Sequence, residues 1–139
     1  MSSDAILSKQ APEPVGPYPH AKRVGNLLFL SGIGPRKKGS KEIPGVELDS
    51  DNSSIIGYDI AQQCHSAFQN VQHVLETSGS NIDQLVDITV FLTNMKDDFA
   101  TFNQIYADYF GEVRPCRTTV EINALPTPIA IELKCIAAL

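Results

Sequence analysis

The sequence predicts a single α+β domain over residues 1–139, in which two helices pack on one face of a mixed two-layer sheet. Two observations predict it. Two segments have apolar residues at helical spacing, and short apolar or alternating segments lie before, between and after them. An amphipathic helix and a one-sided sheet each bury an apolar surface, so the two layers cover each other. A chain of this length can bury one such core, and residues 1–13 are expected to form a flexible N-terminal arm.

The composition argues against several classes of function. The net charge of -5 is unfavourable for nucleic-acid binding, which requires a basic face. No apolar run is long enough to span a bilayer, so no membrane partner is expected. The three cysteines form no Cys-x-x-Cys motif, and the first residues do not have the layout of a secretory signal. We therefore expect a cytoplasmic protein with reduced thiols. The three histidines follow no metal-binding pattern, so neither a metal nor a cofactor is expected.

The first third of the chain begins with a proline-rich segment. Pro12, Pro14, Pro17 and Pro19 exclude a helix and predict an extended conformation. Tyr18 lies between two of these prolines on a stiff backbone. Its ring is either directed to a defined place in a site or packed on the body of the domain as part of an edge strand.

A glycine-rich exit from a strand comes next. Residues 26–31, NLLFLS, predict a buried strand, and Gly32 and Gly34 follow it. Glycine lets a backbone approach a ligand closely, but the same SGxG pattern also occurs in simple turns. Residues 35–57 are polar and predict a surface loop or loose hairpin. The basic cluster in this segment either forms a solvated face or attracts a small polyanion electrostatically. The cluster consists of Arg36, Lys37, Lys38 and Lys41.

Residues 59–78 predict the first helix. Asp59 is expected to cap it, with Gln62 in the capping-box position, and Gly79 to end it in a left-handed conformation. His65 and His73 lie off the apolar stripe and are expected to be exposed. The stripe consists of Ile60, Cys64, Ala67, Val71, Val74 and Leu75.

A strand and the second helix follow. Residues 85–92 alternate and predict a strand, with Val86, Ile88, Val90 and Leu92 on its apolar face. Residues 97–110 predict a helix that is capped by Asp97 and stopped at Gly111. Asn103 borders the aromatic side of this helix and is either solvated or an amide at the edge of a pocket. The aromatic side consists of Phe99, Phe102, Tyr106, Tyr109 and Phe110.

The stretch from residue 114 to residue 137 predicts two strands joined as a hairpin by a short turn containing prolines. Arg117 begins the first strand, and Glu132 lies in the second, pointing away from its main apolar face. Glu132 is then either an ordinary solvated carboxylate near Lys134 or a group in a seam covered by a neighbouring subunit. In the second case burial would tune its pKa.

Several stretches resemble the RidA/YjgF/YER057c/UK114 family of enamine/imine deaminases, from about Gly16 to Ala137. They are GPYPHA, Ser31–Gly32, VFLTNMKDDFATFNQIYADYF, RPCRTTVEINALP and IAIELKCIA. The resemblance implies a chorismate-mutase-like fold and a homotrimer with clefts between its subunits. It also implies a small carboxylate-bearing enamine or imine substrate and hydrolysis without a cofactor.

The resemblance also implies roles for six residues. Arg117 would hold the substrate carboxylate through a bidentate pair, and Glu132 would activate water. The substrate pocket would be lined by Tyr18, Ser31, Gly32 and Asn103. One position departs from the family pattern, because Thr119 stands where many members have a cysteine. No thiol-dependent step is therefore expected, since Cys116 precedes the arginine instead of following it.

Within the family, four stretches are most similar to 2-aminomuconate deaminases. They are GPRKKGSKEIPGVELD, LVDITVFLTNMKDDF, VRPCRTTVE and ALPTPIAIELKCIA. This similarity implies conversion of 2-aminomuconate and water to 4-oxalocrotonate and ammonia, with the basic cluster near the second carboxylate. One alternative is a broad deaminase of 2-aminoacrylate and other short imines, such as 2-iminobutanoate and 2-iminopropanoate. Another is a non-enzymatic module, either ligand-binding or chaperone-like, or a ribonuclease-type translation inhibitor.

Overall fold

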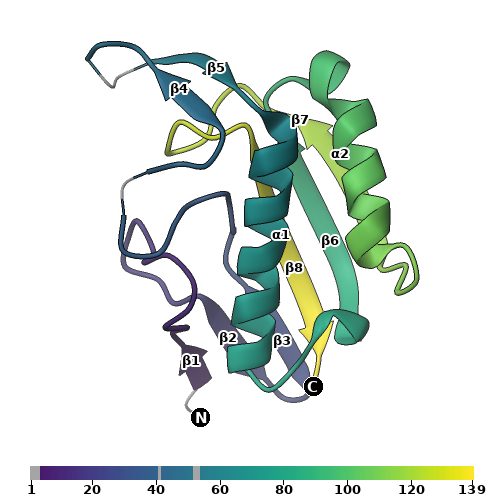
Figure 1. Cartoon of the computed structure of the whole chain (residues 1–139). Coiled ribbons are helices and arrows are strands. Elements are labelled where there is room, and N and C mark those ends of the chain that lie inside the picture. Colours follow the sequence, from purple (N-terminus) through teal and green to yellow (C-terminus); the bar gives the residue numbers. More distant parts are fainter. Residues whose placement is uncertain (1–3, 41, 52–53) are drawn as a thin grey trace.

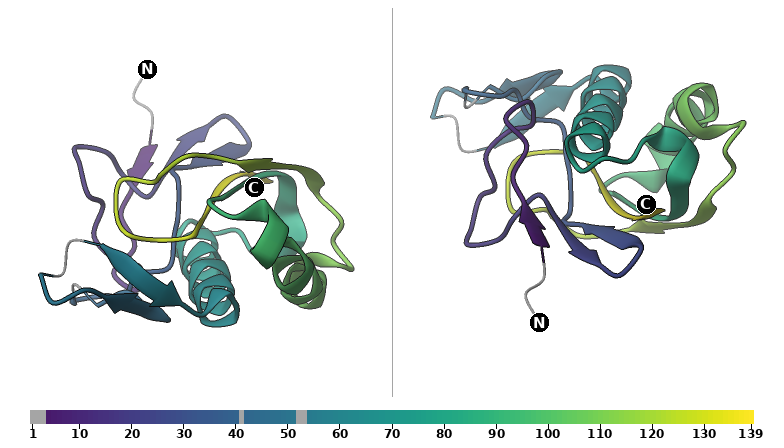
Figure 2. Two further views of the ribbon diagram at one scale, coloured as in Figure 1. Left: turned by 90° about the horizontal axis from the view of Figure 1, so that it is seen from above. Right: turned by 90° about the horizontal axis from the view of Figure 1, so that it is seen from below.

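Two helices lie on one face of a six-stranded sheet in the computed structural model, which describes residues 4–40, 42–51 and 54–139 (Figure 1). They are α1 (Ile60–Thr77) and α2 (Met95–Phe110). The view from above shows both helices on the same side of the strands (Figure 2). The predicted architecture of two helices on a mixed sheet is therefore confirmed. In the described part of the chain, no helix is long and apolar enough to cross a membrane.

The sheet has the order β1-β2-β3-β8-β6-β7. Its neighbouring strands are antiparallel, except that β6 and β7 are parallel. A short 3-10 helix, η1 (Ile82–Gln84), leads into β6. A separate ribbon of β4 (Val46–Leu48) and β5 (Ile55–Tyr58) confirms the hairpin expected in the polar segment. The strands of the main sheet are β1 (Asp4–Ile6), β2 (Ala21–Val24), β3 (Leu27–Leu30), β6 (Leu85–Leu92), β7 (Cys116–Glu121) and β8 (Ile131–Ala138).

The last two strands do not form the predicted hairpin. β7 pairs with β6 on one side, and β8 pairs with β6 on the other, so β6 separates them. Ile88, for example, lies opposite Arg117 in β7 and Cys135 in β8. Parallel neighbours need a crossover connection, and α2 supplies it between β6 and β7. The residues between β7 and β8 then cross the end of β6 instead of making a tight turn.

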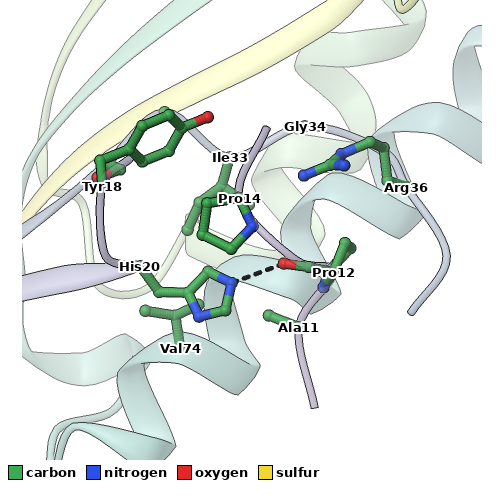
Figure 3. A pocket seen from close by; sticks show the side chains of 11 residues that line it. Ala11, Pro12, Pro14, Tyr18, His20, Ile33, Gly34, Arg36 and Val74 are labelled. Atoms are coloured by element: carbon green, nitrogen blue, oxygen red, sulfur yellow. Dashed lines mark hydrogen bonds between the residues drawn. The ribbon is translucent and has the colours of Figure 1, made fainter. Parts of the chain in front are cut away.

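The N-terminal residues are not the expected flexible arm from Asp4 onward. β1 pairs with β2, and the buried ring of His20 fixes the following segment. The Ser8 amide donates to Nδ1 of this ring at 2.7 Å. On the other side of the ring, Nε2 bonds the Pro12 carbonyl oxygen at 2.6 Å (Figure 3). No local pattern in the segment predicted these bonds, because His20, which makes them, lies further along the chain than Ser8 and Pro12. Residues 1–3 of the predicted arm lie outside the described residues.

Capping explains where the two helices begin and end. The amide of Gln62 donates to the side chain of Asp59 at 3.2 Å, and Gly79 has a φ of +82°, so the predicted cap and the left-handed end of α1 are confirmed. The predicted capping box is not closed, because the Asp59 amide donates to the Gly45 carbonyl oxygen at 2.7 Å. α2 begins earlier than predicted, since its N-cap is Asn94, which accepts a bond from the Asp97 amide at 3.1 Å. Asp97 lies in the first turn, where a negative charge also favours a helix. It was therefore mistaken for the cap.

The apolar faces of α1 and β6 meet in the core. The predicted α1 stripe is buried except for the partly exposed Ile60, and Phe68 completes it. In β6 the alternation is interrupted by a bulge between Leu85 and Asp87. Leu85 is consequently buried, whereas Val86, which was predicted to face the core, is 45% exposed.

A partly buried hydrogen bond ties the β4–β5 ribbon to α2. The hydroxyl of Tyr58 donates to Oδ2 of Asp98 at 2.6 Å, and Asp98 is only 5% exposed. We expect Tyr58→Phe to lower the free energy of unfolding by about 1–3 kcal/mol, because a buried carboxylate loses its donor. Urea unfolding measures this change. Tyr109→Phe is the matched control, because its hydroxyl bonds the exposed His65, and it should change stability by less than about 0.5 kcal/mol. Equal midpoints for the two variants would contradict the assignment.

Candidate active site

Glu132 lies near the start of β8 and points to the sheet face opposite the helices. Its neighbours Ile131 and Leu133 are fully buried in the core, so the alternation predicted from the sequence is confirmed. The side chain of Glu132 is partly buried within the chain and is not simply solvated. This burial raises the pKa of the carboxyl group, and the charge of Arg36 partly opposes the shift. Lys134 is not its partner, since its ammonium donates to the Leu30 carbonyl oxygen at 2.7 Å.

Glu132 shares a pocket with two residues that the sequence assigned to the substrate site, Tyr18 and Gly32. We call it the Glu132 pocket. Its other lining residues are Val15, Gly34, Arg36, Pro126, Thr127 and Ile129.

Long-range backbone bonds place Gly32 against Glu132. Ile33 and Leu133 exchange two backbone hydrogen bonds, of 2.8 and 2.9 Å, which hold the segment after β3 beside β8. A Cβ atom on Gly32 would lie 2.8 Å from the carboxyl carbon of Glu132, closer than carbon atoms pack. Glycine is therefore required at this position for the carboxylate to lie where it does.

Ser31 braces the segment that carries Tyr18. Its hydroxyl donates to the Pro19 carbonyl oxygen at 2.7 Å, and its amide donates to the His20 carbonyl oxygen at 3.0 Å. Ser31, Tyr18 and Gly32 line a second, adjoining pocket, which is shown in Figure 3. The hydroxyl of Ser31 still has lone pairs free to accept a bond, but its proton is committed to the protein.

Arg117 lies on the helix side of the sheet. Its Nη1 donates to Oδ1 of Asn103 at 2.7 Å, so the structure brings together two of the predicted site residues. The guanidinium carbon lies 4.7 Å from the centre of the Tyr106 ring and 5.4 Å from that of Phe102. These rings orient the guanidinium through cation–π contacts. No carboxylate of the described residues forms an ion pair with Arg117, so its charge is available to an anion.

The predicted residues therefore form two separate groups in one chain. Tyr18, Ser31 and Gly32 lie with Glu132, whereas Asn103 lies with Arg117. Glu132 projects from the open face of the sheet, and Arg117 projects toward α2. Neither pocket beside Glu132 includes Arg117. Within one chain each group is half of the predicted site.

Sequence reasoning missed some of the surroundings of these groups. It noted the basic cluster but could not single out Arg36, whose neighbours Lys37 and Lys38 have the same charge. Lys38 pairs with Glu13 at 2.7 Å and Lys37 with Glu42 at 3.9 Å, while Lys41 lies outside the described residues. The aromatic side of α2 was predicted, but its contact with Arg117 was not. Thr119, at the family's cysteine position, has a buried hydroxyl with no hydrogen-bond partner among the described residues.

Comparisons with known proteins identify the family. A family model described as Endoribonuclease L-PSP matches residues 8–139. A RutC family protein of Pyrococcus abyssi is 35% identical over 137 residues, which cover 99% of this chain and 98% of that protein. The structure of the Escherichia coli YjgF gene product is 31% identical, with a TM-score of 0.83 over 98% of each chain. This chain belongs to the RidA/YjgF/UK114 family.

A further relative in the RidA/YjgF/UK114 family has an activity in its name. Reactive Intermediate Deaminase A of Arabidopsis thaliana chloroplasts is 30% identical over 139 residues, covering 100% of this chain and 67% of that protein. The likeness covers both groups of predicted site residues, because it spans the whole chain. In the part of this family member that the structure describes, no group of three or more His, Cys, Asp or Glu residues is arranged to hold a metal ion.

The buried carboxyl group of Glu132 predicts a pH dependence. Burial favours its protonated form and raises its pKa, so a general base at this position is lost at a higher pH than an exposed glutamate would be. In a plot of kcat/KM against pH for a reaction that uses Glu132 as general base, we expect the midpoint of the acidic limb to lie above the usual pKa range of glutamate. The folded state also binds this proton more tightly than the unfolded state, so this group's contribution to stability falls as pH rises through the raised pKa. An acidic limb at the pKa of an exposed glutamate would contradict the assignment.

Proposed function

We propose that the protein hydrolyses enamine and imine substrates that carry a carboxylate, releasing ammonia. The main support is that the two half-sites, the Arg117 group and the Glu132 group, present the two functions that this reaction needs, an anion anchor and a general acid or base. One presents an arginine without an acidic partner among the described residues, and the other presents a glutamate whose pKa is raised by burial. The likeness to a relative named Reactive Intermediate Deaminase A favours the same class of reaction.

Each group has a defined role in this reaction. The planar fork of Arg117 binds the substrate carboxylate through two parallel hydrogen bonds and so fixes the neighbouring C–N centre. The enamine first tautomerises to its imine, whose carbon is electrophilic once the nitrogen is protonated. Water adds to this carbon while Glu132 accepts a water proton, and a carbinolamine forms. Glu132 returns this proton to the carbinolamine nitrogen. As the C–N bond breaks, the carbinolamine hydroxyl gives its proton to the freed Glu132 carboxylate, and a carbonyl compound and ammonia leave.

We further propose that the working form is a homotrimer with a site in each cleft between subunits. The separation of the two half-sites within one chain supports a site completed by a second copy. The open face of the sheet supports such contacts as well, because Leu27 and Phe29 are 38% and 36% exposed beside the buried Leu28 and Leu30. An apolar face of this kind is usually covered by a partner. Light scattering of the purified protein tests the oligomeric state.

For the substrate we propose 2-aminomuconate, which is converted to 4-oxalocrotonate. A test compares ammonia release from 2-aminomuconate and from 2-aminoacrylate generated in the assay, after subtraction of the uncatalysed rates. A higher kcat/KM for 2-aminomuconate supports this substrate, whereas a higher value for 2-aminoacrylate indicates the broad deaminase. No acceleration with either compound refutes the deaminase.

The name of the matching family model favours a second candidate, an endoribonuclease. The net charge of -5 is unfavourable for binding an RNA backbone. RNA cleavage that is retained through purification and lost in Arg117→Ala would support this candidate over the deaminase.

A further inference from the structure

Arg36 places a positive charge in the Glu132 pocket. Both side chains line this pocket together with Tyr18, and the charge of Arg36 lowers the pKa of Glu132 against the effect of burial. In Figure 3 the guanidinium of Arg36 and the hydroxyl of Tyr18 point toward one another. The half-site that presents the carboxylate therefore contains a cation of its own, in addition to Arg117 in the other half-site.

Hydrogen bonds hold Arg36 in this position. The amide nitrogen of Asn70, a buried residue of α1, donates to the carbonyl oxygens of Gly34 and Arg36, both at 3.0 Å. The guanidinium of Arg36 donates to the main-chain carbonyl oxygen of Glu13. The carboxylate of Glu13 is engaged by Lys38 instead. Arg36 thus has a neutral hydrogen-bond partner, and it forms no ion pair with the carboxylates of the described residues.

We propose that Arg36 binds a second anionic group of the substrate and makes the site selective for dicarboxylates. The inference rests on the proposed function, in which Arg117 holds the first carboxylate and Glu132 acts at the C–N centre. A second carboxylate in the Glu132 pocket would be repelled by Glu132, and Arg36 offsets this repulsion. Its planar fork also matches a carboxylate through two hydrogen bonds.

The same arrangement disfavours substrates with an uncharged end. An apolar end would enter the pocket without pairing the guanidinium and would remove part of its hydration. Selectivity then arises because Arg36 raises the binding affinity for dicarboxylates and lowers the binding affinity for monocarboxylates. Lys37 cannot replace Arg36 in this role, because it does not line the Glu132 pocket and it pairs with Glu42 at 3.9 Å.

Two unreactive ligands test the inference by isothermal titration calorimetry. Muconate and sorbate have the same six-carbon diene skeleton, and sorbate has a methyl group where muconate has its second carboxylate. We expect the wild-type protein to bind muconate about 10-fold more tightly or better, the effect of one charge-assisted contact. Arg36→Gln should lose this preference, and Lys37→Gln, which removes the same charge one residue away, should keep it. Circular dichroism and light scattering check that the variants are folded and assembled.

The outcomes separate this inference from the proposed function. The Arg36 assignment is overturned if the wild-type protein shows no preference for muconate, or if Arg36→Gln keeps the wild-type preference. These results do not depend on turnover. If neither imine substrate is hydrolysed while the preference still requires Arg36, the deaminase proposal fails and the second anchor stands. If 2-aminomuconate is hydrolysed equally well by wild type and Arg36→Gln, the deaminase stands and the second anchor fails.

Discussion

Arg117→Ala is expected to lower kcat/KM for the hydrolysis of a carboxylate-bearing imine by roughly 10²–10⁴-fold. The variant loses two charge-assisted hydrogen bonds to the substrate, each of about 1.5–3 kcal/mol. The fold should survive, because among the described residues the guanidinium hydrogen-bonds only the exposed Asn103, and it otherwise rests on the rings of α2. A cation–π contact contributes about 0.5–1 kcal/mol where it is exposed and about 2 kcal/mol where it is desolvated, and Arg117 is only partly buried. Steady-state ammonia release and thermal unfolding measure the two effects.

Two further variants sharpen this test. Arg117→Lys keeps the charge but not the fork, so it should restore only part of the activity. Arg114→Ala removes an exposed arginine three residues earlier and should leave kcat/KM unchanged. Full activity in a folded, assembled Arg117→Ala protein would show that the carboxylate is held elsewhere.

Glu132→Gln is expected to lower kcat by about 10²–10⁴-fold, the usual contribution of a general acid or base. The amide has the same shape, so it should fit beside Gly32 as the carboxylate does. Substrate binding should be kept or become tighter, because the proposed anchors are arginines and the variant removes the negative charge that would repel the second carboxylate. Steady-state kinetics measures kcat, and titration with muconate measures binding.

The matched control is Glu112→Gln, which removes one negative charge from an exposed position after α2. We expect its kcat to equal that of the wild-type protein. Unchanged turnover in Glu132→Gln would mean that another group activates water. A large loss of muconate binding with normal kcat would instead assign Glu132 to binding.

The sequence predicted the helices well and the order of the strands poorly. The stripe of α1 repeats over 18 residues, so its period and its Asp59 cap were clear. The alternation of apolar residues in β7 and β8 shows which face of each strand is apolar. It does not show whether the two strands pair with each other, because the alternation is the same when a third strand lies between them. The crossover through α2 and the bulge before Asp87 depend on long-range pairing, which no local pattern records. The N-terminal strand was missed for the same reason, since the residues that fix it follow in β2 and at His20.

The candidate site was predictable as a set of residues and less so as an arrangement. The outward direction of Glu132 followed from alternation alone. Its pocket did not, because the bonds between Ile33 and Leu133 join segments about one hundred residues apart. Arg36 could not be distinguished from Lys37 either, since only the contacts of Asn70 and Glu13 direct one side chain to the pocket and leave the other outside.

The placement of Arg117 and Glu132 on opposite sides of one sheet has a genetic consequence. In a ring built from identical head-to-tail contacts, every cleft receives its arginine from one subunit and its glutamate from the next. Subunits lacking Arg117 and subunits lacking Glu132 would then complement each other. An equal mixture, unfolded and reassembled together, would contain about one intact cleft in four. Two inactive gene products would regain activity only in mixed oligomers.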